Sequence, residues 1–272
     1  MPNSYPKNTT EALKNYYDKY WESRISSDKP YTDPHSPFYV DKRLRLAQEY
    51  TRIRKLSRGI VLDLGCGPSV YLGKFHGDNL NVGIDISLRI LSGIKKYSSD
   101  VRLVNAAAES IPLKNLSTDI IFCMHIMEHV VNEQTVLAEM KRVLKPDGCI
   151  LFQIPNGYSA FYCPKRIIRI FLATISGRKY SEGETFYDCI GKEAHLRRYS
   201  LKKFVRLLRE NGFRVKKARG IFIDNAGRFP RVFDALIRNK VAFSLLSLLS
   251  ALFPTLGAEF TVLAQIKHEN NS

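Results

Sequence analysis

The sequence predicts an α/β fold, a seven-stranded, mostly parallel sheet with helices on both faces. Five short and nearly continuous apolar segments alternate with helical patterns between residues 59 and 156. Strands of this kind are buried on both faces, which is typical of parallel sheets covered by helices. Two further strand patterns, at 213–222 and 259–267, would complete the sheet as a hairpin-like pair.

At the N-terminal end, residues 10–24 predict an amphipathic helix that carries three tyrosines and a tryptophan. A loop rich in Pro, Ser and Asp follows, and a second helical pattern covers 39–56. We therefore expect an N-terminal helical cap over residues 1–58 and one larger domain over residues 59–272.

In the larger domain, helices are expected at 88–97, at 134–144 and at 200–211, and the segment KPDG would close the second of them. Ser200 suits the N-cap of the last helix, and Gly212 lies just past its end. The five apolar strand segments are 59–65, 81–87, 101–107, 119–126 and 149–156.

Two helical insertions interrupt this pattern, at about 157–200 after the fifth strand and at about 224–257 after the sixth. Residues 157–240 carry 20 Lys and Arg against 7 Asp and Glu, so they hold most of the net charge of +16. The longest apolar segment, 241–253, is too short to span a bilayer. Two interpretations stay open: the insertions rest on an anionic membrane surface, or they form a substrate lid or a homodimer interface.

The composition is that of an ordinary globular protein, 44% hydrophobic and 25% charged. The five cysteines form no CxxC pair, and Cys123 and Cys149 lie within predicted strands, which indicates reduced and buried thiols. The N-terminal segment lacks the apolar stretch of a secretory signal. We therefore expect a cytoplasmic protein, with peripheral membrane contact as the open alternative.

The most informative motif is the segment VLDLGCGPS at 61–69. Gly65 and Gly67 follow a strand directly, so the backbone can turn tightly and approach a ligand that a Cβ would block. Asp85 ends the next strand, where a carboxylate can accept hydrogen bonds from both hydroxyls of a ribose. The dinucleotide fingerprint G-x-G-x-x-G does not fit, because its third glycine would fall at Val70.

Six segments place the chain by resemblance. DLGCG, GIDIS, AAAESIPL, HIMEHV, RVLKPDG and IPN occur within residues 60–156 in the order and spacing of class I S-adenosylmethionine-dependent methyltransferases. The chain is most similar to their small-molecule, ubiquinone-biosynthesis-like branch, and residues 195–213 resemble that branch before its sixth strand. The resemblance implies a Rossmann-like fold and S-adenosyl-L-methionine as the cofactor.

The resemblance also implies roles for individual residues. The segment with Asp63, Gly65, Cys66 and Gly67 would meet the methionine end of the cofactor. Asp85, followed by Ile86, would bind the ribose. Where the family often has an aspartate for the adenine amino group, this chain has Ala107, so the adenine contact is expected from backbone groups or from Glu109. The remaining cofactor contacts expected are Ala108 beside the adenine and His125 at the end of the fourth strand.

For catalysis, a positioned base would assist transfer to a hydroxyl, and histidine suits that task near neutral pH. His195 is the favoured base because the substrate lid of similar enzymes lies there, and His129 is the second candidate; a purely structural role for His195 stays open. Related quinone O-methyltransferases hold a divalent cation with two acids and a histidine in the fourth block. Here His125 replaces the first of those acids, so no metal ion is predicted.

We therefore expect methyl transfer to a small-molecule or lipid-linked acceptor, most plausibly at oxygen. Nucleic acid is disfavoured as a substrate, because no Asn/Asp-Pro-Pro-aromatic loop follows the fourth strand. The only Cys-Pro pair, at Cys163, also lies away from the place of a cytosine-directed nucleophile. Two alternatives are kept: a non-catalytic binding protein with the same fold, and an RNA methyltransferase that uses the basic C-terminal half.

Overall fold

The computed structural model describes six main stretches of the chain, residues 9–22, 59–68, 79–94, 101–157, 195–221 and 259–267. It also describes a few single positions, namely Ser176, Leu245, Leu248, Leu249, Leu252, Phe253 and Gly257. The helix predicted at 39–56 and most of both insertions lie outside the described residues. None of the described helices has the length and hydrophobicity that crossing a bilayer requires.

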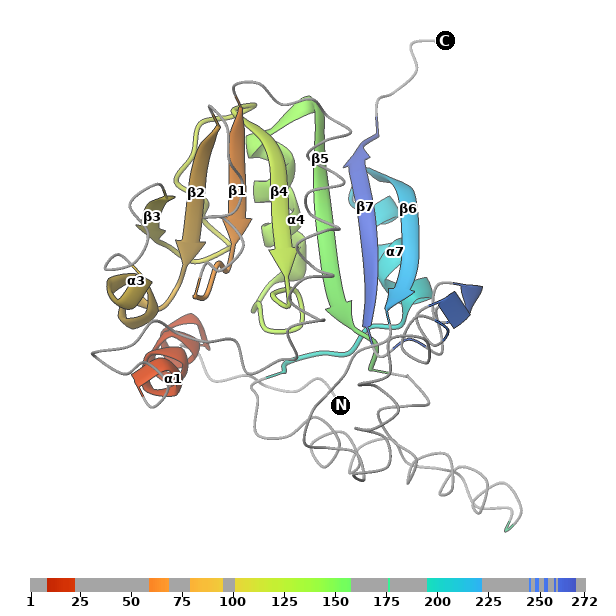
Figure 1. Cartoon of the computed structure of the whole chain (residues 1–272), viewed down its shortest axis with the longest axis horizontal. Coiled ribbons are helices and arrows are strands. Elements are labelled where there is room, and N and C mark those ends of the chain that lie inside the picture. Colours follow the sequence, from red (N-terminus) through yellow and green to blue (C-terminus); the bar gives the residue numbers. More distant parts are fainter. Residues whose placement is uncertain are drawn as a thin grey trace.

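The described elements confirm the predicted alternation of strands and helices (Figure 1). Their order along the chain is α1 (Thr9–Glu22), β1 (Ile60–Leu64), β2 (Leu80–Asp85), α3 (Leu88–Ile94), β3 (Val101–Asn105), β4 (Thr118–Met124), α4 (Glu133–Val143), β5 (Leu144–Pro155), α7 (Leu201–Glu210), β6 (Phe213–Ile221) and β7 (Glu259–Ile266).

The seven strands form one sheet in the order β3-β2-β1-β4-β5-β7-β6. The first five strands in the chain run parallel to their neighbours, whereas β7 is antiparallel to both β5 and β6. In Figure 1 the parallel strands all end at the same edge of the sheet, and α1 lies beyond that edge next to α3. This carboxyl edge is where ligands bind in open α/β sheets.

Both faces of the sheet are covered by helices, as the near-continuous apolar strands predict. On one face, α4 and α7 bury residues such as Leu137 and Phe204 in the largest core cluster, and the Phe204 ring packs edge-on against Phe152 of β5 at 5.1 Å. On the other face, Leu103 of β3 contacts Ile90 of α3. The sheet is thus held from two sides.

One predicted boundary is wrong. The second helix ends just before KPDG at 145–148, as expected, with Leu144 as its C-cap, but the fifth strand begins at Leu144 and not at residue 149. Leu144 pairs with Thr118, and the ladder between β4 and β5 shifts register just after that pair. Residues 145–148 have no partner in β4 within this ladder, and the Lys145 ammonium lies 2.9 Å from the Asp119 carboxylate.

Candidate active site

The turn after β1 depends on two glycines in left-handed conformations. Gly65 has φ +71° and Gly67 has φ +48°, a region that residues with a Cβ rarely adopt. The amides of Gly65 and Cys66 both donate to the carbonyl oxygen of Ile84, at 2.7 and 2.9 Å. The turn is therefore fixed against the end of β2, and at Gly65 and Gly67 it carries no side chain that would separate its backbone from a ligand.

Asp85, the last residue of β2, lies beside this turn. Its two carboxylate oxygens accept one amide hydrogen bond each, from Gly67 and from Ser87, both at 2.9 Å. Burial raises the pKa of Asp85 to about 6, the negative charge of Asp18 adds to this, and the amide bonds oppose it. Each oxygen keeps a further acceptor position, which is what two neighbouring ribose hydroxyls need.

Asp63 and Asp85 share one neighbour, the buried thiol of Cys66. Burial raises the pKa of Cys66, and the charges of Asp85 and Asp63 raise it further, which places both carboxylates close to the thiol. Both aspartates are themselves buried. The glycine turn and two acidic groups thus meet at the carboxyl edge, a set that fits an adenosyl group carrying a cationic sulfonium.

Helix α1 lies against the residues that follow Asp85, a contact that the sequence did not indicate beyond the aromatic face of this helix. Asp18 accepts hydrogen bonds from the Ser87 hydroxyl at 2.5 Å and from the Arg89 amide at 3.3 Å. A Cβ placed on Gly67 would lie 3.6 Å from the Trp21 ring. The glycine turn and Asp85 are therefore bordered by α1 as well as by the sheet.

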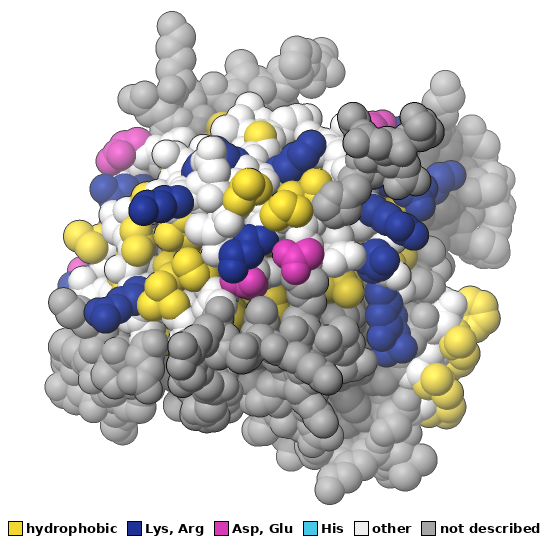
Figure 2. Space-filling view, turned by 90° about the horizontal axis from the view of Figure 1, so that it is seen from above, with side chains coloured by type: hydrophobic (Ala, Val, Ile, Leu, Met, Phe, Trp, Pro, Cys, Tyr) yellow, Lys and Arg dark blue, Asp and Glu magenta, His cyan; other side chains and the backbone are white. Residues whose placement is uncertain are grey.

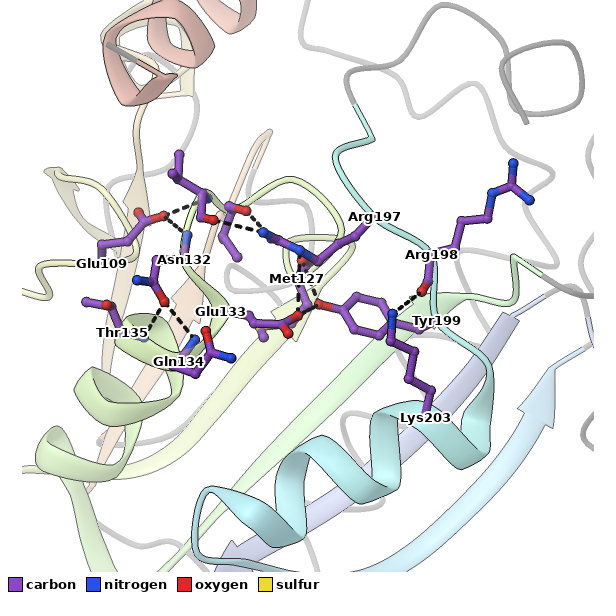
Figure 3. Close-up of polar contacts among 12 residues, drawn as sticks. Glu109, Met127, Asn132, Glu133, Gln134, Thr135, Arg197, Arg198, Tyr199 and Lys203 are labelled. Carbon is purple, nitrogen blue, oxygen red and sulfur yellow. Dashed lines mark hydrogen bonds and ion pairs between the residues drawn. The ribbon is translucent and has the colours of Figure 1, made fainter. Parts of the chain in front are cut away.

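The predicted adenine side is partly placed. The amide of Ala106 donates to the carbonyl oxygen of Asp85 at 3.1 Å, so the segment that contains Ala108 follows the end of β2 closely. The carboxylate of Glu109, however, turns to the start of α4 and accepts from the amides of Val131 and Asn132 at 2.9 and 3.4 Å (Figure 3). Backbone groups are accordingly the better source of an adenine contact.

At the end of β4, three histidines surround one buried carboxylate. His125 has φ +57°, and its Nδ1 lies 3.4 Å from Oε1 of Glu128, while its Nε2 lies 3.1 Å from Glu259 of β7. His129 Nε2 lies 3.8 Å from Glu128 Oε1. Burial acts to raise the pKa of Glu128, but the contact with His125 and the charges on His129, His125 and His195 outweigh it and lower the pKa.

His195 is buried and reaches the same cluster from a distant part of the sequence. Its ring packs against that of His129 with centroids 4.6 Å apart. The two predicted catalytic residues therefore lie together. Glu259 comes from the antiparallel strand β7 and carries no local motif, so no sequence pattern indicates its place beside His125.

The segment that carries His195 is fastened along the loop after β4. The amides of Leu196 and Arg197 donate to the carbonyl oxygen of Glu128, at 2.8 and 3.3 Å. Figure 3 shows the Arg197 guanidinium against the carbonyl oxygens at the start of α4 and the Tyr199 hydroxyl bonded to Glu133. Burial raises the pKa of Tyr199, and Glu133 raises it further, so the phenol stays a donor.

A family model described as a methyltransferase domain matches residues 62–152. An uncharacterized protein of Methanocaldococcus jannaschii is 27% identical over 236 residues, which is 85% of this chain and 88% of that protein. A sarcosine/dimethylglycine N-methyltransferase of Aphanothece halophytica is 26% identical, covering 59% of this chain and 60% of its own. A ubiquinone biosynthesis O-methyltransferase of Thiobacillus denitrificans is 31% identical, covering 48% of this chain and 60% of its own.

The fold recurs among solved structures. A chain in the complex between the Trm112 methyltransferase activator of Haloferax volcanii and a methyltransferase superposes with a TM-score of 0.57, at 16% identity, over 96% of this chain and 100% of that one. Likeness at this level of identity concerns the fold. The matched regions span 60% of the two named methyltransferases above, so their acceptors do not carry over directly.

Proposed function

Because the chain is a class I S-adenosylmethionine-dependent methyltransferase, we propose that it methylates an oxygen atom of a small or lipid-linked acceptor. The observation that supports oxygen is the cluster of Glu128, His129 and His195 at the end of β4. A neutral amine offers its lone pair without help, whereas a hydroxyl needs a group that accepts its proton. A cluster of two imidazoles and a carboxylate beside the cofactor site suits the second task.

Two groups of residues along the carboxyl edge would have different roles, one in binding the cofactor and the other in accepting the proton of the acceptor. Asp85 and the glycine turn would bind and orient the adenosyl group, and α1 would exclude water from the ribose side. S-adenosylmethionine supplies a methyl group already activated on a sulfonium. The acceptor oxygen forms the new bond to the methyl carbon, the carbon–sulfur bond breaks with its electron pair on sulfur, and the hydroxyl proton goes to the histidine cluster, His195 being the favoured acceptor of it.

A labelled-methyl assay tests this proposal. The full chain is incubated with methyl-labelled S-adenosylmethionine and separated lipid and aqueous extracts of the source cell, alongside panels of phenols and of secondary amines. We expect label in an O-methyl product, and a loss of about 10²- to 10⁴-fold in turnover for His195→Ala. Asp119→Asn is the matched control, because Asp119 pairs with Lys145 at the start of β4, away from the carboxyl edge. Label only in N-methyl products would overturn the proposal.

A lipid-linked acceptor is supported by one apolar surface. Leu245, Leu248, Leu249 and Leu252 recur at helical spacing, and they and Phe253 are between 38% and 64% exposed. Figure 2 shows hydrophobic side chains at the margin of the molecule where Figure 1 places this segment, and Lys and Arg side chains across the same view. This combination fits an anionic membrane surface.

Sedimentation with vesicles tests the membrane contact. Wild type should pellet with phosphatidylglycerol vesicles at low salt and be released at high salt, because each basic residue near the surface adds about 1 kcal/mol that salt screens. Replacing Leu248 and Leu252 by serine should reduce pelleting without lowering the melting temperature. If the same amount of protein stays in the supernatant with and without vesicles, the membrane contact is refuted. A homodimer that buries this apolar surface would instead support its role as a subunit interface.

A further inference from the structure

We propose that Glu128, His129 and His195 bind a divalent transition-metal ion. Each residue offers one ligand atom, and these atoms all lie within 4.8 Å of one another. The ligand atoms around a tetrahedral zinc-type ion at 2.0–2.1 Å are about 3.4 Å apart, so side-chain rotations that close the cluster by about an ångström would suffice. This inference deepens the proposed function and rests on it for the role of the ion.

The carboxylate of Glu128 is the first independent observation. Its side chain is only 2% exposed, and among the described residues its partners are the imidazoles of His125 and His129, neither of which makes a hydrogen bond of good geometry with its oxygens. Burying a carboxylate in this way is costly unless it is paired or coordinates a metal. The contacts to His125 and His129, at 3.4 and 3.8 Å, are longer than hydrogen bonds. A cation among the three groups would satisfy the oxygens directly.

The second observation is that the ligands are held in place before any ion arrives. The carbonyl oxygen of Glu128 accepts the amides of Leu196 and Arg197, so the backbone next to His195 is tied to the backbone of Glu128 itself. The ring of His129 packs edge-on against Tyr17 of α1, with centroids 5.7 Å apart. Ligands fixed by surrounding contacts lose little freedom on binding, which favours a specific site.

The ligand types select the kind of ion. Two imidazoles and one carboxylate suit zinc, iron, cobalt or nickel, whereas magnesium and calcium prefer all-oxygen sets. Three protein ligands leave a position open, as in catalytic rather than structural sites. His125 is a supporting residue and not a ligand here, because its Nε2 is already 3.1 Å from Glu259, whose other oxygen accepts from the Gln153 side chain.

The ion would lie at the acceptor side of the active site. A hydroxyl oxygen that contacts a divalent cation loses its proton more readily, so with the ion bound the proton would pass to solvent and not to an imidazole that ligates the ion. His195 would then act as a ligand. The sequence-based expectation of no metal considered only residues 125–129, where an acid is missing, and the structure brings the third ligand from position 195 instead.

Metal binding by the full chain tests the site without any methyl acceptor. The protein is stripped with a chelator and titrated with Co²⁺, Zn²⁺ or Mg²⁺ by calorimetry, and visible absorption of Co²⁺ is recorded. We expect one Co²⁺ or Zn²⁺ per chain and no measurable Mg²⁺ binding. His195→Asn and Glu128→Gln should each weaken binding by more than about 100-fold, and Asp119→Asn, at the opposite end of β4, should leave it unchanged.

Folding is checked separately by melting temperature and by S-adenosylhomocysteine binding of each variant. If His195→Asn does not fold, His129→Asn takes its place. Wild-type binding below half an ion per chain, or equal affinity in wild type and the ligand variants, would overturn the metal proposal. O-methyl transfer that persists in the presence of a chelator would also overturn the metal proposal, but it would remain consistent with the proposed function. Tight metal binding with label only in N-methyl products would instead overturn the proposed function.

Discussion

The titration of Asp85 gives a quantitative test of the cofactor site. Its pKa is raised from 3.8 to about 6 in the folded protein, mainly by burial. The pKa of Asp85 is higher in the folded protein than in the unfolded chain, so the folded state favours the protonated carboxyl. The free energy of unfolding is therefore highest below about pH 4, and it falls as the pH rises through about 6, where the buried carboxyl must ionise. A difference of about two pKa units corresponds to about 3 kcal/mol.

The ligand should oppose this effect. Ribose hydroxyls donate to a carboxylate, so binding requires the ionised form of Asp85. At pH 5 only about a tenth of a group with a pKa near 6 is ionised, and the affinity for S-adenosylmethionine should be about tenfold lower than at pH 8. Asp85→Asn removes the charge, so we expect a loss of about 10- to 100-fold at pH 8 and no step near pH 6.

The assay is calorimetric titration of wild type and Asp85→Asn from pH 5 to pH 8, in which protonation of the ligand's own groups affects both proteins equally. Asp119→Asn is the matched control, because Asp119 is also buried but pairs with Lys145 at the start of β4, away from the carboxyl edge. It should keep the step near pH 6. Parallel curves for wild type and Asp85→Asn would refute a contact between this carboxylate and the ligand.

Two other predictions concern the fold around the site, and both are measured by urea unfolding. Gly65→Ala should lower the free energy of unfolding by more than about 2 kcal/mol, because the new Cβ would lie 1.8 Å from Cδ1 of Ile126 and the backbone has φ +71°. Gly67→Ala should lower it by only about 1 kcal/mol, because its Cβ would lie 3.6 Å from the Trp21 ring. Equal losses for the two variants would contradict this order. Ser200→Ala should cost about 1 kcal/mol, because the hydroxyl accepts the Lys203 amide at 3.2 Å as the N-cap of α7, and an unchanged midpoint would show that the cap contributes nothing.

Most of the sheet was predictable because its signal is local. A strand such as 119–126 is apolar on both faces, and the structure buries both of its sides, with Ile121 in one core cluster and Phe122 in the other. The N-cap at Ser200 and the positive φ of Gly212 likewise follow from residue type. The start of β5 was not predictable in this way. Pro and Gly in KPDG indicate a turn, whereas β5 already begins at Leu144, which pairs with Thr118, and residues 145–148 lie at the register shift between β4 and β5.

The candidate site was predictable only in part, and the difference lies in sequence separation. The glycine turn and Asp85 sit on consecutive strands, so their proximity follows from a parallel sheet. The contact of Glu109 with the start of α4, and that of the segment at His195 with Glu128, are fixed by tertiary packing. No local pattern encodes such contacts, and so the resemblance suggested His195 as a base while its place beside Glu128 became visible only in the fold.

The charge of the carboxyl edge links the cofactor site to the proposed metal site. The whole chain carries a net charge of +16, yet Asp63, Asp85, Glu128 and Glu259 are all buried at this one edge. Burial of the Asp85 carboxylate lowers the stability of the empty site, as its raised pKa shows, whereas the imidazoles around Glu128 lower the pKa of that carboxylate and offset its burial. A sulfonium and a divalent cation are both positive, so each would relieve part of this cost when it binds. Relief of the burial cost of Asp85 would then supply part of the binding energy, so Asp85→Asn should stabilise the empty protein while it weakens cofactor binding.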